Sequence, residues 1–142
     1  MAAAASVVSY TVLDSTSDGG SVTTVQGVEL EPHSVVPGEE PLHLSRPFAV
    51  SAAVFVEIAE GVLDSEFHNA PREQFIVVLQ GRLRSETTDG AVSYAGPGDV
   101  LLVRDVAGTG HRASVLESPL RVLFLPVAGA QPAEVSEVAR DG

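Results

Sequence analysis

Short runs of apolar residues, separated by turn-forming residues, dominate the middle of the chain. Val, Ile, Leu and Phe are concentrated in these runs, and Gly, Pro, Asp or Ser stands between them, a pattern typical of β-strands. Short runs spaced roughly 8–12 residues apart favour an all-β sandwich or barrel. The pattern predicts strands at residues 21–30, 48–58, 73–80, 82–87, 92–94, 100–103, 111–115 and 120–127.

The runs differ in how their two faces are composed. Residues 75–79 and 100–103 are apolar at every position, so strands there are expected to be covered on both faces. Residues 82–87 alternate instead, and their charged side chains stand at every second position. Successive side chains of a strand point to opposite faces, so the charged face is expected to meet solvent. The opposite face of that strand carries Leu83, Ser85 and Thr87.

The two ends of the chain lack this pattern. Residues 1–20 are weakly patterned and end in a stretch rich in Ser, Thr, Asp and Gly, which predicts a weakly ordered N-terminal segment. Residues 128–142 read as a polar tail whose one helix candidate is residues 132–140. A chain of 142 residues suits a single domain. The expected organisation is therefore one β domain over residues 21–127 between two terminal segments.

Composition and charge exclude several function classes. All eight basic residues are arginine, against 19 acidic residues, a net charge of -11 and no cysteine. Schiff-base lysines, phosphate-loop lysines, thiol nucleophiles and thiolate metal sites are therefore excluded. So acidic a chain repels phosphates and anionic lipids, so neither nucleic acid nor a membrane is an expected partner. Without a recognisable leader or a membrane-spanning run, the expected location is cytoplasmic.

The candidate chemistry lies before and after the two fully apolar runs. His68 precedes the first run, Gln74 begins it, and Gly81 follows it. The turn at residues 96–99 opens the second run, and the chain then reaches His111 through a glycine-rich stretch. Histidine, with an ordinary pKa of about 6.5, can act as acid or base near neutrality. A glutamine amide both donates and accepts hydrogen bonds.

These residues resemble the two motifs of the cupin superfamily. His68, then Gln74, then Gly81 after six residues matches the spacing of the first motif, and Pro97-Gly98-Asp99 followed by His111 matches the second. The resemblance covers roughly residues 47–127. It implies a single jelly-roll sandwich or barrel, a small-molecule substrate and a homodimer. In cupins the metal usually sits on three histidines and one glutamate.

The chain departs from that metal-binding pattern at two positions. Ala70 stands where the second histidine is expected, and Gln74 where the glutamate is expected. An amide is a poorer ligand than a carboxylate, so no cofactor is the first expectation. The alternative is a weakly held Fe, Ni, Cu or Zn ion on His68, Gln74 and His111. His43 or Glu57 could complete that set if the fold brought either of them near.

The leading functional hypothesis is a cupin-fold enzyme that acts by acid/base chemistry on a small, largely apolar, carbonyl-containing metabolite, as an isomerase, cyclase, dehydratase or decarboxylase of secondary metabolism. His68 and His111 would be acid and base, Gln74 would orient the substrate, and Arg72 would clamp an anion. Two alternatives are a metal-dependent oxygenase using His68, Gln74 and His111, and a non-catalytic small-molecule-binding protein. Tyr94, Arg104 and Asp105 are interpreted as turn or strand-edge residues.

Overall fold

The computed structural model describes residues 6–62 and 66–130, and these residues contain strands and loops without a helix. The all-β prediction is therefore confirmed. The strands are β1 (Ser6–Ser15), β2 (Ser21–His33), β3 (Leu42–Leu44), β4 (Val54–Ile58), β5 (Gln74–Glu86), β6 (Val92–Ala95), β7 (Val100–Arg104) and β8 (Arg112–Pro126).

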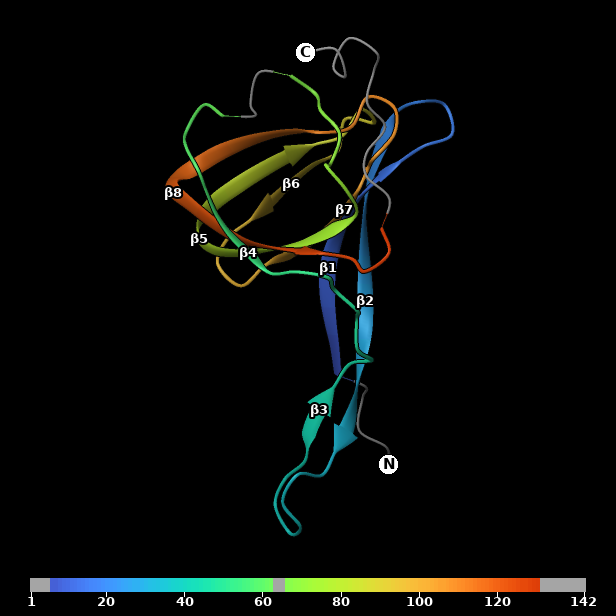
Figure 1. Ribbon diagram of the computed structural model, residues 1–142, viewed down its shortest axis with the longest axis vertical. Coiled ribbons are helices and arrows are strands. Elements are labelled where there is room, and N and C mark those ends of the chain that lie inside the picture. The colour runs from blue at the N-terminus through green and yellow to red at the C-terminus, as the bar shows by residue number, and fades with distance from the viewer. Residues whose placement is uncertain (1–5, 63–65, 131–142) are drawn as a thin grey trace.

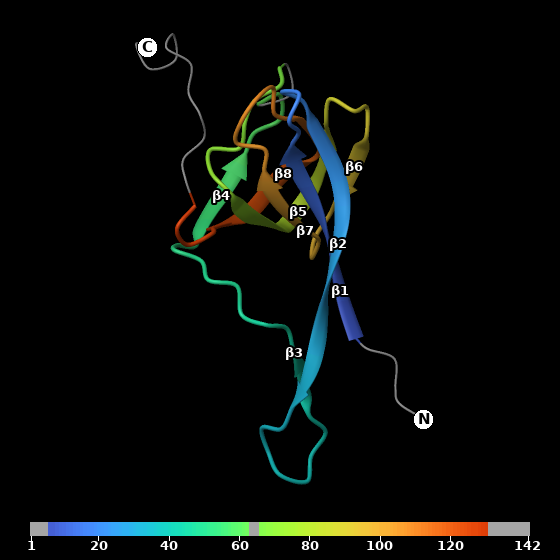
Figure 2. The same cartoon turned by 90° about the vertical axis from the view of Figure 1, so that its right-hand side faces the viewer.

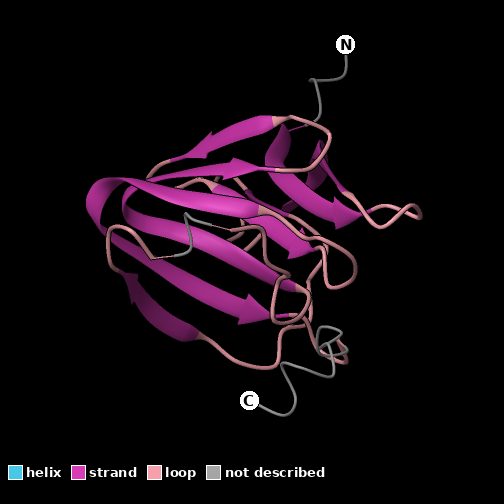
Figure 3. Cartoon of the chain, turned by 90° about the horizontal axis from the view of Figure 1, so that it is seen from above, coloured by secondary structure: helices cyan, strands magenta, loops and turns pink. Residues whose placement is uncertain are grey.

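The strands form one curled sheet in the order β3-β2-β1-β7-β5-β8-β4, and β6 pairs with β5 off this path. β1 and β7 run parallel, and the other pairs are antiparallel. Viewed from above, the long strands wrap around a common interior (Figure 3). Because side chains alternate along each strand, every strand of this wall sends one set of residues inward.

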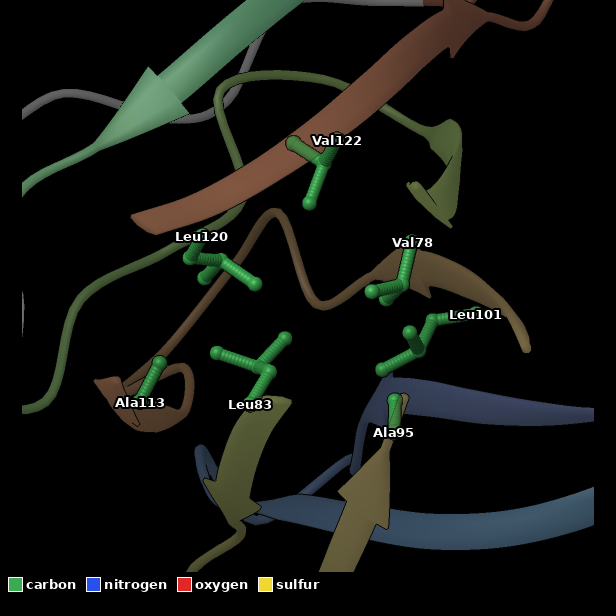
Figure 4. Close-up of a cluster of buried hydrophobic side chains, with 7 residues drawn as sticks. All are labelled: Val78, Leu83, Ala95, Leu101, Ala113, Leu120 and Val122. Carbon is green, nitrogen blue, oxygen red and sulfur yellow. The ribbon is translucent and has the colours of Figure 1, made fainter. Parts of the chain in front are cut away.

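The interior contains the main hydrophobic core. Its buried side chains come from β5, β6, β7 and β8 and converge on one another (Figure 4). The members of this cluster are Val78, Leu83, Ala95, Leu101, Ala113, Leu120 and Val122. The turn that opens β7 is fixed to the same core wall, because Val78 and the turn residues Gly98 and Asp99 exchange backbone hydrogen bonds.

An arm made of β1, β2 and β3 projects beyond the barrel (Figures 1 and 2). β3 pairs with the far end of β2, opposite residues 31–33. Val7 and Val25 lie on the same face of the β1–β2 ladder, because Val25 pairs with Thr11 and side chains four residues apart share a face. Their side chains are 51% and 70% exposed, so the arm presents apolar surface.

The structure corrects the predicted boundaries at several points, and the strand predicted at residues 48–58 begins only at Val54. Residues 6–15, expected to be weakly ordered, form β1, because they pair along their whole length with β2 and over residues 11–14 with β7. Four predicted strands merge into two, since β5 continues through Gly81 and β8 through residues 116–119. The interruptions appear as register shifts between β5 and β8. The helix candidate at residues 132–140 lies outside the described residues.

Candidate functional site

His68 and His111 are held side by side by the backbone. Each donates its N–H to the carbonyl oxygen of the other, over 2.8 and 2.9 Å, as an isolated antiparallel bridge. Directly opposed residues in such a bridge project to the same side. The two imidazole centroids are therefore only 4.6 Å apart, with the rings inclined at 58°.

The loop that leads into His111 is anchored from two other segments. The Asn69 side chain donates to the carbonyl oxygens of Asp105 and Gly108, at 3.1 and 3.0 Å. The Ser21 hydroxyl donates to the carbonyl of Gly110 at 2.6 Å. Gly110 has φ +79°, and a Cβ there would lie 2.0 Å from the carbonyl oxygen of His68. Only glycine permits this close approach, so the glycine at residue 110 allows the segments of His68 and His111 to lie together.

Behind His111 lies a buried carboxylate that the sequence analysis interpreted as a turn residue. Asp105 is 0% exposed, and its Oδ2 accepts a hydrogen bond from Nδ1 of His111. Its Oδ1 is buried without a hydrogen-bond partner among the described residues. A carboxylate can only accept a hydrogen bond. The proton of a neutral His111 is therefore on Nδ1, which donates to Asp105, and Nε2 carries the lone pair. Asp105 thereby fixes the tautomer of His111.

His68 has a different environment. Its Nδ1 lies 3.4 Å from the carbonyl oxygen of Glu66, and because a carbonyl accepts, this contact favours the tautomer with the proton on Nδ1. Burial, and next the neighbouring His111, hold the pKa of His68 below its ordinary value of 6.5. Near neutral pH His68 is therefore uncharged, with Nε2 free to accept a proton.

Both histidines line a cavity of about 250 Å³ inside the barrel. Gln74 and Ser85 are its other polar side chains, and both are buried. The remaining wall is apolar and comes from β1, β4, β5, β7, β8 and the segment before β5: Leu13, Ile58, Ala70, Pro71, Ile76, Leu83, Leu101, Val103, Ala113, Val122 and Phe124. No arginine, aspartate or glutamate of the described residues lines this cavity. The site is therefore an apolar cavity with a few hydrogen-bonding side chains on its wall.

The structure brings together three of the four predicted catalytic residues, His68, Gln74 and His111. Arg72, predicted to clamp an anion, is exposed and does not line the cavity. Arg72 lies in a bend of the chain between Pro71 and Gln74, which both line the cavity. Ser85 was missed as a site residue, although its alternation with Leu83 had already placed it on the buried face.

The donor set does not fit the usual cupin metal centre. Ala70 forms part of the cavity wall at the position of the second histidine, and Gln74 supplies a neutral amide. The two residues that could have completed a metal site do not line the cavity. Glu57 is exposed and accepts a hydrogen bond from Arg121, and His43 is exposed in β3 on the arm. Within the described residues no group of three His, Cys, Asp or Glu side chains is arranged to hold a metal. This donor set therefore suits chemistry carried out by side chains.

A curled all-β barrel with histidines from two separate segments meeting at an internal cavity defines a small barrel protein of the jelly-roll class. The family model described as Cupin domain matches residues 54–126, and the chain belongs to this family. No curated protein matches the chain significantly. In the part of the chain that the structure describes, no helix has the length and hydropathy needed to cross a membrane.

The low pKa of His68 predicts a specific pH dependence of stability. Between the lowered pKa and 6.5 the unfolded chain binds more protons at this residue than the folded chain, so its contribution to unfolding free energy rises with pH. We expect acidification from about pH 7 to about pH 5 to destabilise the wild type more than His68→Gln. Denaturant unfolding at several pH values measures this difference.

The control for that experiment is His33→Gln, which changes an exposed histidine at the end of β2. It should retain the pH dependence of the wild type. Parallel pH profiles for the wild type and His68→Gln would contradict the assignment of a lowered pKa to His68.

Proposed function

We propose that this protein catalyses proton transfer on a small neutral molecule that carries a carbonyl group. The observation that carries the proposal is the pair of adjacent imidazoles on the wall of an apolar cavity, one of them backed by the buried carboxylate of Asp105. Paired titratable groups in contrasting environments are the usual arrangement for acid/base chemistry. Isomerases, cyclases and dehydratases that act on neutral substrates all use such a step.

The lining of the cavity limits the substrate. Its volume of about 250 Å³ is below the range of about 300–1,000 Å³ typical of pockets for drug-sized ligands. A carboxylate or phosphate would meet no arginine there, and burying an unpaired charge is costly. A neutral, largely apolar ketone, aldehyde or ester satisfies both constraints.

In the proposed step, Nε2 of His111 removes a proton from the carbon next to the carbonyl group. The electrons of that C–H bond move into an enolate, whose oxygen accepts a hydrogen bond from the Gln74 amide. Asp105 stabilises the imidazolium that forms, because its charge faces the new positive charge. The proton then returns from His111 to another carbon or to the oxygen, either directly or after Nε2 of His68 has accepted it, so an isomerisation balances without an oxidant or a cofactor.

The proposal can be tested without knowing the natural substrate. Small neutral ketones are incubated with the protein in deuterated water, and deuterium incorporation next to the carbonyl is followed by NMR. We expect exchange above the buffer rate, reduced about 10²–10⁴-fold in His111→Gln, the range attributed to general acid/base groups. His33→Gln should exchange at the wild-type rate. Exchange at the buffer rate with every ketone, or unaffected by His111→Gln, would contradict the proposal.

The same samples discriminate the two alternative functions. A ketone that raises the melting temperature without exchanging deuterium would indicate a non-catalytic binding protein. Activity that disappears with a chelator and returns with Fe, Ni, Cu or Zn would indicate a metal-dependent enzyme using His68, Gln74 and His111.

The homodimer and the cytoplasmic location stay predictions. The exposed apolar face of the arm, which includes Val7 and Val25, supports self-association, since contiguous exposed apolar surface marks interaction sites.

A further inference from the structure

A second concave site lies on the outer face of the sheet, behind the barrel cavity. Phe75 of β5 and Leu102 of β7 line it, whereas their neighbours Gln74, Leu101 and Val103 line the barrel cavity. The alternation of strand side chains therefore places the two sites back to back across one sheet. We name this second site the outer groove. It measures about 280 Å³ and is further lined by Tyr10, Gln26, Arg46, Pro47, Phe48, Ala49, Glu73, Arg104, Val127 and Ala128.

One wall of the outer groove is aromatic. Phe48 meets Phe75 edge-to-face, with centroids 5.3 Å apart and an interplanar angle of 79°. Tyr10 meets the same Phe75 ring at 6.0 Å and 68°. Edge-to-face packing of this kind holds rings in defined orientations. The three rings thus form a rigid, partly exposed surface on which another flat apolar group can pack.

The outer groove also contains an arginine that has no ion-pair partner among the described residues. The Arg46 guanidinium carbon lies 4.1 Å from the centroid of Phe48, and a stacked guanidinium keeps its edge N–H groups available. Four other arginines of the described residues have a carboxylate within 4.0 Å: Arg84, Arg104, Arg112 and Arg121. Arg46 has no carboxylate within this distance in the part of the chain that the structure describes, although the net charge of the chain is -11.

The remaining charges of the outer groove restrict the ligand further. The Nε of Arg104 donates to Asp14 at 2.9 Å, so this second cation is already balanced. Glu73 lines the outer groove as well, and its carboxylate opposes a second negative charge on a ligand. The outer groove therefore matches one anionic group beside one flat apolar group.

We propose that the outer groove binds a small aromatic monocarboxylate. The carboxylate pairs with the edge of the Arg46 guanidinium, and the ring of the ligand packs against Phe48 and Phe75. Planar bidentate pairing with carboxylates is the geometry that arginine favours. This ligand differs in charge from the neutral molecule proposed for the barrel cavity, so the two sites are chemically separate.

The test uses naphthoate as the probe and NMR to locate it on the protein. We expect saturable shifts at the backbone amides of Phe75, Leu102 and Ala128, and affinity reduced about tenfold in Arg46→Gln, the effect of losing a charged hydrogen-bonding partner. The affinity of Arg46→Lys for naphthoate should lie between those of the wild type and Arg46→Gln, since lysine keeps the charge and loses the planar guanidinium. Arg82→Gln is the matched control, because Arg82 also has no ion pair within residues 6–62 and 66–130 and faces an aromatic ring, Tyr94, outside the outer groove.

Two further ligands test the charge argument. Naphthamide, which has the same shape without the charge, and naphthalene dicarboxylate, which adds a second charge, should both bind more weakly than naphthoate. Equal affinity of the wild type and Arg46→Gln, or shifts confined to the residues that line the barrel cavity, would overturn the proposal. Binding that weakens as the protein is concentrated into a dimer would show that a second copy covers the outer groove, and would also overturn it.

Discussion

Gly110→Ala should be among the most destabilising single substitutions in this protein. A methyl group at residue 110 would lie 2.0 Å from the carbonyl oxygen of His68 and 2.8 Å from the amide nitrogen of Asn69, both backbone atoms that cannot rotate away. Relief of that overlap requires separation of the His68 and His111 segments and loss of their two backbone hydrogen bonds. We expect the unfolding free energy to fall by about 4 kcal/mol or more, a loss that few single substitutions cause.

Gly98→Ala is the matched control for this prediction. Gly98 has a similarly positive φ of +90°, but a Cβ there meets nothing within 4 Å. Its cost should be limited to the conformational penalty of a left-handed residue, about 1–2 kcal/mol. Denaturant unfolding of both variants separates backbone conformation from close approach. Equal losses for the two variants would contradict the role given to Gly110.

Of the two strands that were expected to be covered on both faces, β7 is buried at Leu101, Leu102 and Val103, whereas β5 leaves Leu79 44% exposed. β7 was predicted almost to its ends, because an uninterrupted apolar run needs no partner to be recognised. β1 was missed because Ser9 and Thr11 interrupt its apolar pattern, and its stability comes from pairing with β2 and β7, which are distant along the chain. Gly81 read as the end of a strand, yet it sits inside β5 with φ +85° against the backbone of residues 117–120. Such long-range pairing is not encoded in a local window.

The candidate site was predicted where motif spacing carried the information. His68, Gln74 and His111 do share one cavity. Asp105 was missed because it follows the buried strand β7 and precedes a glycine-rich stretch, which is the ordinary setting of a turn residue. The chain instead folds back between Asp105 and His111, so a residue six positions earlier contacts the imidazole. Arg72 does not line the cavity, because it lies in the bend before β5, where strand alternation does not hold and its side chain is exposed.

Substitutions at Asp105 should produce the second large effect. Asp105→Ala removes the buried partner of His111 and leaves Nδ1 without an acceptor in a dry environment, and breaking a buried pair costs about 3–5 kcal/mol. Asp14→Ala is the control, because the Asp14–Arg104 pair is about one-third exposed on both sides and such pairs contribute about 0–1 kcal/mol. A loss for Asp105→Ala no larger than for Asp14→Ala, measured by denaturant unfolding, would contradict this account.

Asp105→Asn tests the electrostatic role of this carboxylate with little change in volume. An asparagine oxygen can still accept from Nδ1 of His111, but the charge that stabilises an imidazolium is gone, so deuterium exchange into ketones should fall about 10²–10⁴-fold. A second readout separates this effect from simple damage to the structure. The charge of Asp105 raises the pKa of His68 and the charge of His111 lowers it, so Asp105→Asn should lower the NMR titration midpoint of His68 whereas His111→Gln should raise it. A structural collapse of the site would instead expose His68 and raise its pKa toward the ordinary value in both variants. Opposite shifts of the His68 pKa in the two variants therefore indicate that Asp105 acts as a positioning carboxylate.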